Sequence, residues 1–188
     1  FGWESEYVFR GTQLAEDYFA PSVDVSYGGL YAGVWAALPV DHVYDNEVDL
    51  YAGYGASLNE LMSIDLGFTY YTYPDIQDDL FDGDTNTFEP YVGLSFEVPL
   101  SPSVYVFYDM DLETLTAEGS LGHSFEVSDV AAVDVGAFLG YYDPDMGSSN
   151  EYYGASVSYN YSFTDNAAVS MGVNWYGSGE NTMLYMRS

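Results

Sequence analysis

Hydrophobic and polar residues alternate with a period of two along most of the chain. Between 62 and 71, for example, Ile64, Leu66 and Phe68 alternate with Asp65 and Gly67. The same alternation recurs at 48–54, 88–98, 133–141 and 153–161. This period is typical of β-strands with two chemically different faces, and no segment has the 3.6-residue period of an amphipathic helix. The pattern therefore predicts an all-β protein.

Clusters of Gly, Pro, Asn and Asp divide the pattern into about twelve strands, with tight turns and mostly longer loops in alternation. This arrangement predicts a single domain over 1–188 that folds as a closed, antiparallel, up-and-down transmembrane β-barrel. The predicted strands lie near 3–11, 20–28, 30–38, 46–57, 61–73, 87–98, 103–110, 112–125, 130–142, 151–163, 167–177 and 180–187.

The contents of the two faces favour a membrane barrel over a soluble β-sandwich, which is the alternative for alternating strands. In these segments the apolar phase carries no charged residue, and its aromatic residues gather near both ends of the strands. Two aromatic rings around an aliphatic band match the interfacial girdles of outer-membrane barrels. They are formed by Tyr27, Tyr54, Phe96, Phe125 and Tyr161 beside the tight turns, and by Tyr70, Phe88, Tyr108, Tyr141, Tyr153 and Trp175 at the opposite ends.

The charge balance excludes several functions. The chain has 188 residues, 30 acidic residues against the two arginines Arg10 and Arg187, and a formal net charge of −28. Nucleic-acid binding is therefore not expected, because it needs clustered cations. The absence of cysteine excludes thiolate chemistry. No uncharged run reaches the roughly 20 residues of a membrane helix. The chain opens without the basic and apolar regions of a signal peptide, so it is either cytosolic or numbered from the start of a mature chain, which is what we expect for an outer-membrane barrel.

The polar phase predicts an acidic lumen that contains water or cations, because a dry core does not tolerate so many unpaired carboxylates. Because rings of carboxylates favour cations, this phase fits a cation-selective pore. A solvated, non-conducting interior fits the same residues equally well. We expect Arg10 to anchor the wall by pairing with neighbouring acids, with a constriction that controls permeation as the alternative. The predicted lumen and selectivity residues are Arg10, Glu6, Asp24, Glu47, Asp49, Asp65, Glu89, Glu97, Glu118 and Asp134.

Two acidic loops are candidates for loose Ca²⁺ binding, because this cation prefers several oxygen ligands. The candidate residues are Asp82, Asp84 and Asn86 in the first loop and Asp143 and Asp145 in the second. Solvated turn chemistry explains the same residues, so we expect no required cofactor.

Recurring Tyr-x-Gly units predict tyrosine rings that cover glycines of neighbouring strands, as in curved sheets. They occur at 31–33, 51–53 and 91–93. An enzymatic function is not expected, because the two histidines, His42 and His123, accompany no nucleophile motif.

Several motifs in the first half resemble the TorF porin family, also called the Gcw_chp family. They are Tyr7-Val8-Phe9-Arg10-Gly11, Gly29-Leu30-Tyr31-Ala32-Gly33-Val34-Trp35, Glu47-Val48-Asp49-Leu50-Tyr51-Ala52-Gly53-Tyr54 and Tyr70-Tyr71-Thr72-Tyr73-Pro74. The resemblance implies a barrel of the bacterial outer membrane without catalytic residues.

These observations lead to a porin-like channel for small cationic or neutral solutes as the first hypothesis. The alternative is a non-conducting structural or interaction barrel whose acidic loops bind divalent cations or partners. Either protein would contact outer-membrane lipid and lipopolysaccharide, and homo-oligomers or envelope proteins are the further partners we consider.

Overall fold

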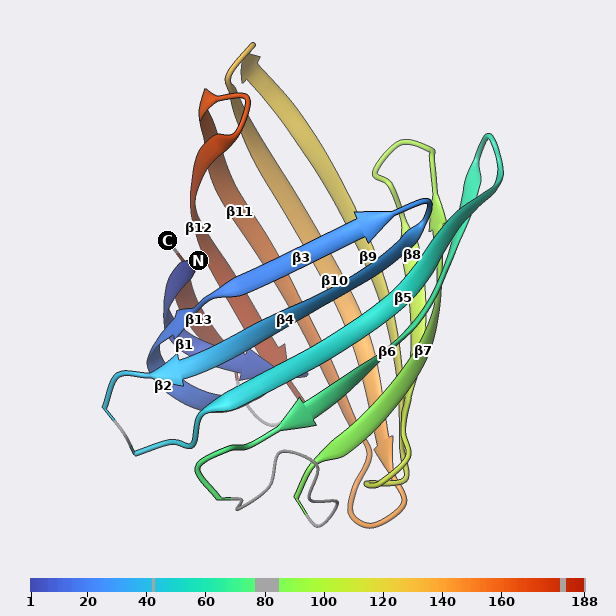
Figure 1. Ribbon diagram of the computed structural model, residues 1–188, viewed down its shortest axis with the longest axis vertical. Helices are drawn as coiled ribbons and strands as arrows, with labels where there is room; N and C mark the ends of the chain where they lie inside the picture. Colours follow the sequence, from blue (N-terminus) through green and yellow to red (C-terminus); the bar gives the residue numbers. More distant parts are fainter. Residues whose placement is uncertain (42, 77–84, 180–181, 188) are drawn as a thin grey trace.

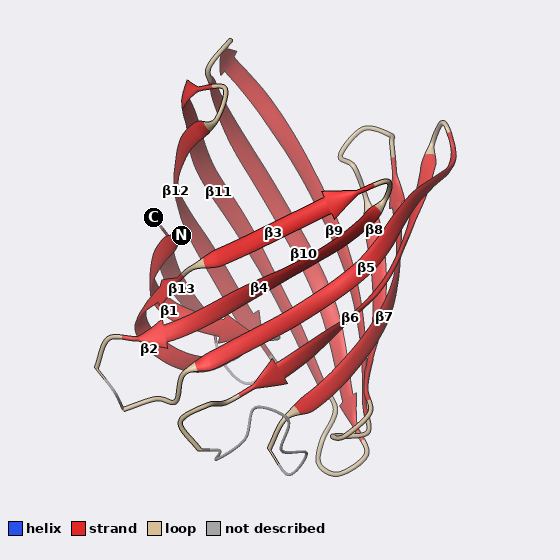
Figure 2. Ribbon diagram, in the orientation of Figure 1, coloured by secondary structure: helices blue, strands red, loops and turns tan. Residues whose placement is uncertain are grey.

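The computed structural model describes residues 1–41, 43–76, 85–179 and 182–187, and it contains strands and loops throughout (Figures 1 and 2). Over these residues no helix is long and apolar enough to cross a membrane. The thirteen described strands are β1 (Gly2–Phe9), β2 (Thr12–Ala20), β3 (Ser22–Tyr27), β4 (Leu30–Pro39), β5 (Glu47–Asn59), β6 (Met62–Thr72), β7 (Thr87–Phe96), β8 (Ser103–Asp109), β9 (Thr114–Ser128), β10 (Ala131–Pro144), β11 (Asn150–Thr164), β12 (Ala167–Ser178) and β13 (Thr182–Arg187).

The strands form one antiparallel sheet that curves into a nearly closed barrel (Figure 1). The order is β2-β1-β13, then each strand in descending number to β3, and β2 pairs with β4 as well. Only Pro21 separates β2 from β3, and both strands pair with the same edge of β4. They therefore share one position, and the thirteen described strands occupy twelve positions around the barrel. The all-β antiparallel barrel of about twelve strands is thus confirmed.

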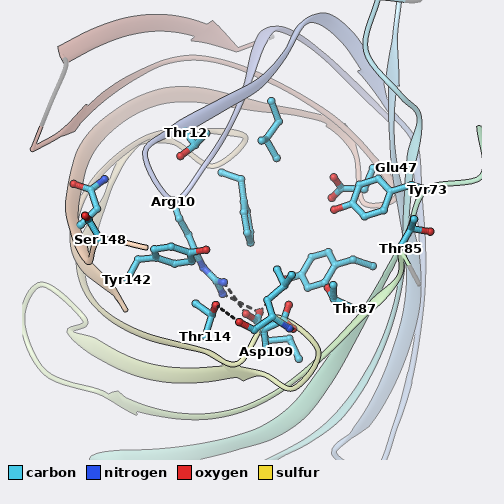
Figure 3. Close-up of a pocket in the computed structure, with 16 residues that line it drawn as sticks. Arg10, Thr12, Glu47, Tyr73, Thr85, Thr87, Asp109, Thr114, Tyr142 and Ser148 are labelled. Atoms are coloured by element: carbon cyan, nitrogen blue, oxygen red, sulfur yellow. Dashed lines mark hydrogen bonds and ion pairs between the residues drawn. The ribbon is translucent and has the colours of Figure 1, made fainter. Parts of the chain in front are cut away.

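The two ends of the barrel differ as the spacing of the turns predicts. One end, here called the turn end, carries the connections after β3, β5, β7, β9 and β11. The opposite end, here called the loop end, carries those after β4, β6, β8, β10 and β12, which include the longest connection of the chain. The β1–β2 turn also lies toward the loop end, beside residues of these loops (Figure 3).

The apolar phase of the strands points outward and the polar phase points into the lumen. Leu66 is 47% exposed on the outer surface, and Val92, Leu121, Leu139 and Val157 are exposed in the same way. Asp49, in contrast, is only 8% exposed. The barrel is therefore apolar on its outside and acidic on its inside.

Tyrosine rings cover glycines of neighbouring strands on the inner wall, as the Tyr-x-Gly units predict. Tyr51 lies over Gly33, Tyr31 lies over Gly53, and each pair is in register between β4 and β5. A side chain at these glycines would overlap the tyrosine ring, so the glycines let the rings lie flat along the curved wall.

The hairpin formed by β1 and β2 leaves the wall and folds into the lumen. Its wall pairings lie at its base, where Glu4 pairs with β13 and Tyr18 and Phe19 pair with β4. Inside, Tyr18 packs against Ala37 of the wall, with Trp35 beside them. The compact apolar cluster of the protein thus lies between this hairpin and the inner face of β4. The segment 11–19, predicted as a loop, is strand β2, so that part of the prediction is wrong.

One seam of the barrel is unsealed near the turn end (Figure 1). In the described pairings β3 joins only β4 along its length, and Ala167–Met171 of β12 join only β11. The barrel is therefore nearly closed, and this one seam stays open because β1 and β13 are short and do not extend to the turn end.

Candidate functional site

The centre of the lumen is occupied by an ion pair between Arg10 and Glu89. Arg10 lies at the tip of the β1–β2 hairpin, and Glu89 is on β7. Arg10 Nη1 donates to Glu89 Oε2 at 2.6 Å and Nη2 donates to Oε1 at 2.8 Å, a bidentate geometry. The Tyr71 hydroxyl donates to the same carboxylate at 2.9 Å. Glu89 is only 1% exposed, so its charge is compensated by these donors.

Aromatic rings and a tight turn hold Arg10 in this position. The Arg10 guanidinium carbon lies 4.5 Å from the Phe9 ring centroid and 4.9 Å from that of Phe107, within the range of cation–π contacts. Arg10 and Gly11 have φ angles of 49° and 79°, as a two-residue type I′ hairpin turn requires. A side chain at Gly11 would approach the Cβ of Tyr152 to 2.8 Å, so glycine allows the tip to contact β11.

A cavity of about 560 Å³ opens above the ion pair toward the loop end (Figure 3). Arg10 and Glu89 both line this cavity. In Figure 3, Glu47 and Tyr73 lie on one side of it and Tyr142 and Ser148 on the other. Its size is that of a small-molecule site. The lining combines carboxylates, hydroxyl groups and aromatic rings.

Two predicted lumen acids, Glu47 and Asp49, are neighbours on the inner face of β5. Glu47 accepts a hydrogen bond from the Tyr7 hydroxyl at 2.8 Å and is buried. Asp49 is also buried, and its Oδ1 has no hydrogen-bond partner among the described residues. Arg10 is engaged by Glu89 and forms no ion pair with either of these two acids in the described residues.

Tyrosines surround two further predicted acids nearer to the turn end. The Tyr31 and Tyr105 hydroxyls donate to Asp65 at 2.7 and 3.2 Å, and Tyr31 also contacts the Tyr91 hydroxyl. Tyr51 donates to Asp24, which is exposed. Neutral donors thus bind these carboxylates and leave their charge in the lumen.

The other predicted lumen acids occupy different environments. Glu118 accepts a hydrogen bond from Tyr152 at 2.9 Å, and Asp134 accepts one from Asn160 at 2.7 Å. Glu6 Oε2 and Asp134 Oδ1 are buried atoms without a hydrogen-bond partner among the described residues. Glu97 lies beyond the end of β7 and is exposed at the turn-end rim.

The candidate Ca²⁺ loops do not form a metal site in the described part of the chain. Asp82 and Asp84 lie outside the described residues. Asn86 is buried and donates to the Tyr70 hydroxyl at 3.1 Å, whereas Asp143 and Asp145 are exposed. Among the described residues no group of three His, Cys, Asp or Glu side chains could hold a metal ion.

Several residues of the site were not among the predicted site residues. Phe9, Tyr71 and Phe107 surround the Arg10–Glu89 pair, and Tyr152 packs against the hairpin tip. The alternation within their strands places Tyr71 and Phe107 on the inner wall. It does not tell which of the inner side chains the hairpin contacts.

Comparison with known proteins identifies the family of the chain. No curated protein matches it, and no solved structure matches it. A family model described as "Bacterial protein of unknown function (Gcw_chp)" matches residues 1–186, which include the wall of the barrel, the Arg10 hairpin and Glu89. The chain therefore belongs to the Gcw_chp family of bacterial proteins.

Proposed function

We propose that this protein is an outer-membrane barrel whose acidic lumen is a narrow path for small cationic or neutral solutes. The proposal rests on one observation above all: buried carboxylate oxygens of Glu6, Asp49 and Asp134 face the interior without a hydrogen-bond partner among the described residues. Such groups need water or cations beside them. The exposed apolar outer surface supports a location in lipid, where an outward apolar band is required.

The β1–β2 hairpin forms the constriction of this path. Its tip reaches Glu89 of β7 and also contacts Tyr152 of β11, so it crosses the bore. In this proposal Arg10 anchors the hairpin by its ion pair with Glu89, and the constriction that the sequence offers as the alternative role of Arg10 follows from the position of the hairpin tip. Solutes enter from the cavity at the loop end and pass between the hairpin and the acidic wall.

Planar lipid bilayers test the proposal directly. The purified protein, placed between KCl solutions of unequal concentration, should give small currents whose reversal potential shows preference for potassium over chloride. Anion preference, or silence both from the native protein and from the Arg10→Ala variant, would reject a conducting function.

The same hairpin also favours a second function, a non-conducting structural barrel, because its tip fills the centre of the bore. In this case no current appears. If the acidic loops bind divalent cations, EDTA should lower the temperature at which the barrel unfolds in detergent. A magnesium-saturated sample is the matched control, and an unchanged unfolding temperature argues against the cation-binding loops.

A further inference from the structure

The pocket around Glu89 has the features of a guanidinium-binding site that the protein fills with its own Arg10. A carboxylate accepts both Nη groups at 2.6 and 2.8 Å, and an aromatic ring lies on the guanidinium from each of two strands, β1 and β8. Planar bidentate geometry distinguishes a guanidinium from a simple ammonium ion.

Most of this pocket belongs to the barrel wall and does not depend on the hairpin. Glu89 and Tyr71 lie on β7 and β6, and Phe107 lies on β8. Glu89 is paired in register with Thr69, and Phe107 with Tyr91, so the ladders of the wall position both side chains. When Arg10 leaves, a buried carboxylate and its tyrosine donor remain beside the cavity.

The cavity gives a solute direct access to this carboxylate. Glu89 is both the partner of Arg10 and part of the lining of the cavity of about 560 Å³. Glu47 and Asp109 line the same cavity and offer a second negative contact. A solute with one cationic group competes poorly, because Arg10 is tethered beside Glu89 and acts at a high effective concentration. A solute with a second cation gains the additional contact.

We propose that the Glu89 pocket binds short dications that carry a guanidinium at one end and an ammonium at the other, in competition with Arg10. The guanidinium takes the place of the Arg10 side chain on Glu89, and the ammonium lies near Glu47 or Asp109. Displacement of Arg10 releases the hairpin tip from β7. This inference rests on the proposed function, since it names the solute class that enters the lumen.

Chemical rescue of the Arg10→Ala variant tests the pocket, with agmatine and methylguanidinium as probes at millimolar concentration. Both probes should raise the unfolding temperature of this variant. The probe concentration that gives half of the full rise should be at least about tenfold lower than in the Arg10→Ala/Glu89→Gln variant, because the double variant lacks the carboxylate that forms the charged hydrogen bonds. Tetramethylammonium at equal ionic strength is the control. Equal responses of the two variants, or equal effects of tetramethylammonium, would overturn the proposal.

The native protein provides a second measurement that needs no variant to fold. Its two arginines, Arg10 and Arg187, should give two side-chain Nε–H signals in nitrogen-15 NMR spectra. Agmatine should move the Arg10 signal toward the position of a free guanidinium and leave the Arg187 signal unchanged. An Arg10 signal that stays in place up to saturating agmatine contradicts competition at Glu89. Both readouts measure binding in detergent, so a failure of the bilayer currents would reject conduction and not this pocket.

Discussion

Arg10 and Glu89, which are 79 positions apart in the chain, form a bidentate ion pair in the middle of the barrel. This contact joins the tip of an inward-folded hairpin to the opposite wall. It places the one described guanidinium of the lumen on a carboxylate that the barrel ladders hold in position. We therefore expect this pair to hold the hairpin tip in place across the lumen.

Loss of Arg10 should destabilise the protein strongly. In the Arg10→Ala variant the buried Glu89 carboxylate loses its ionic partner, and breaking a buried pair costs about 3–5 kcal/mol. Equilibrium unfolding in denaturant and detergent measures this change. The Arg10→Ala/Glu89→Gln variant should recover part of the loss, because no charge remains unpaired. A double variant as unstable as Arg10→Ala would show that the ion pair is not the cause.

Tyr18 should stabilise the base of the hairpin. It is buried inside the barrel and packs against Tyr7 and Trp35, with ring centroids 5.3 and 6.3 Å apart. Tyr18→Ala should lower the free energy of unfolding by about 3 kcal/mol or more, as is usual for a buried aromatic residue. Phe19→Ala is the matched control, because the neighbouring Phe19 side chain points outward and is exposed. Equal effects of the two substitutions would contradict the inward position of the hairpin.

Gly93 should not tolerate a side chain. The ring of Tyr105 lies where its Cβ would be, so Gly93→Ala should lower the free energy of unfolding by about 1–3 kcal/mol. Gly122 offers a control in strand β9 of the same wall, since a Cβ there meets only the Val135 carbonyl oxygen at 3.6 Å. Thermal unfolding of both variants tests the prediction, and a Gly122→Ala variant as unstable as Gly93→Ala would count against it.

The carboxylates of β5 should set the ionic preference of the lumen. Replacing both in the Glu47→Gln/Asp49→Asn variant removes two titratable carboxyl groups from the wall near the hairpin. The potassium-over-chloride preference, measured as a reversal potential, should fall about twofold or more. The Asp143→Asn/Asp145→Asn variant removes two carboxyl groups from exposed positions and should change this preference less. A larger effect of the exposed pair would assign selectivity to the loops.

The period of two was sufficient to predict most of the barrel, because each wall strand carries apolar side chains on its outer face and polar side chains on its inner face. Between Ile64 and Phe68 this alternation agrees with the observed register of β6 and β7. The rings of Tyr31 and Tyr51 over glycines were also predictable, since the paired residues recur at fixed spacing.

The hairpin was not predictable from the same pattern. Strand β2 changes its surroundings along its length, because its end at Tyr18 pairs with β4 in the wall while its start lies at the hairpin tip. Leu14, Glu16 and Tyr18 therefore share one phase without a common polarity. The partner of Arg10 depends on how far the hairpin tilts into the bore, and strand periodicity contains no information on this tilt. Glu97 shows a related limit, because a strand phase does not tell where the strand ends.

The central claim is that the outer face of the barrel contacts lipid and the inner face contacts water. The chain has no cysteine, so single cysteines can be introduced on neighbouring positions of β6 and β7 without background. In lipid vesicles, a charged, water-soluble maleimide should label the Ser63→Cys and Ser95→Cys variants and leave Leu66→Cys and Val92→Cys unlabelled, because the serines line the lumen phase. Equal labelling of all four variants, or labelling of the Leu66 and Val92 positions alone, would contradict the account.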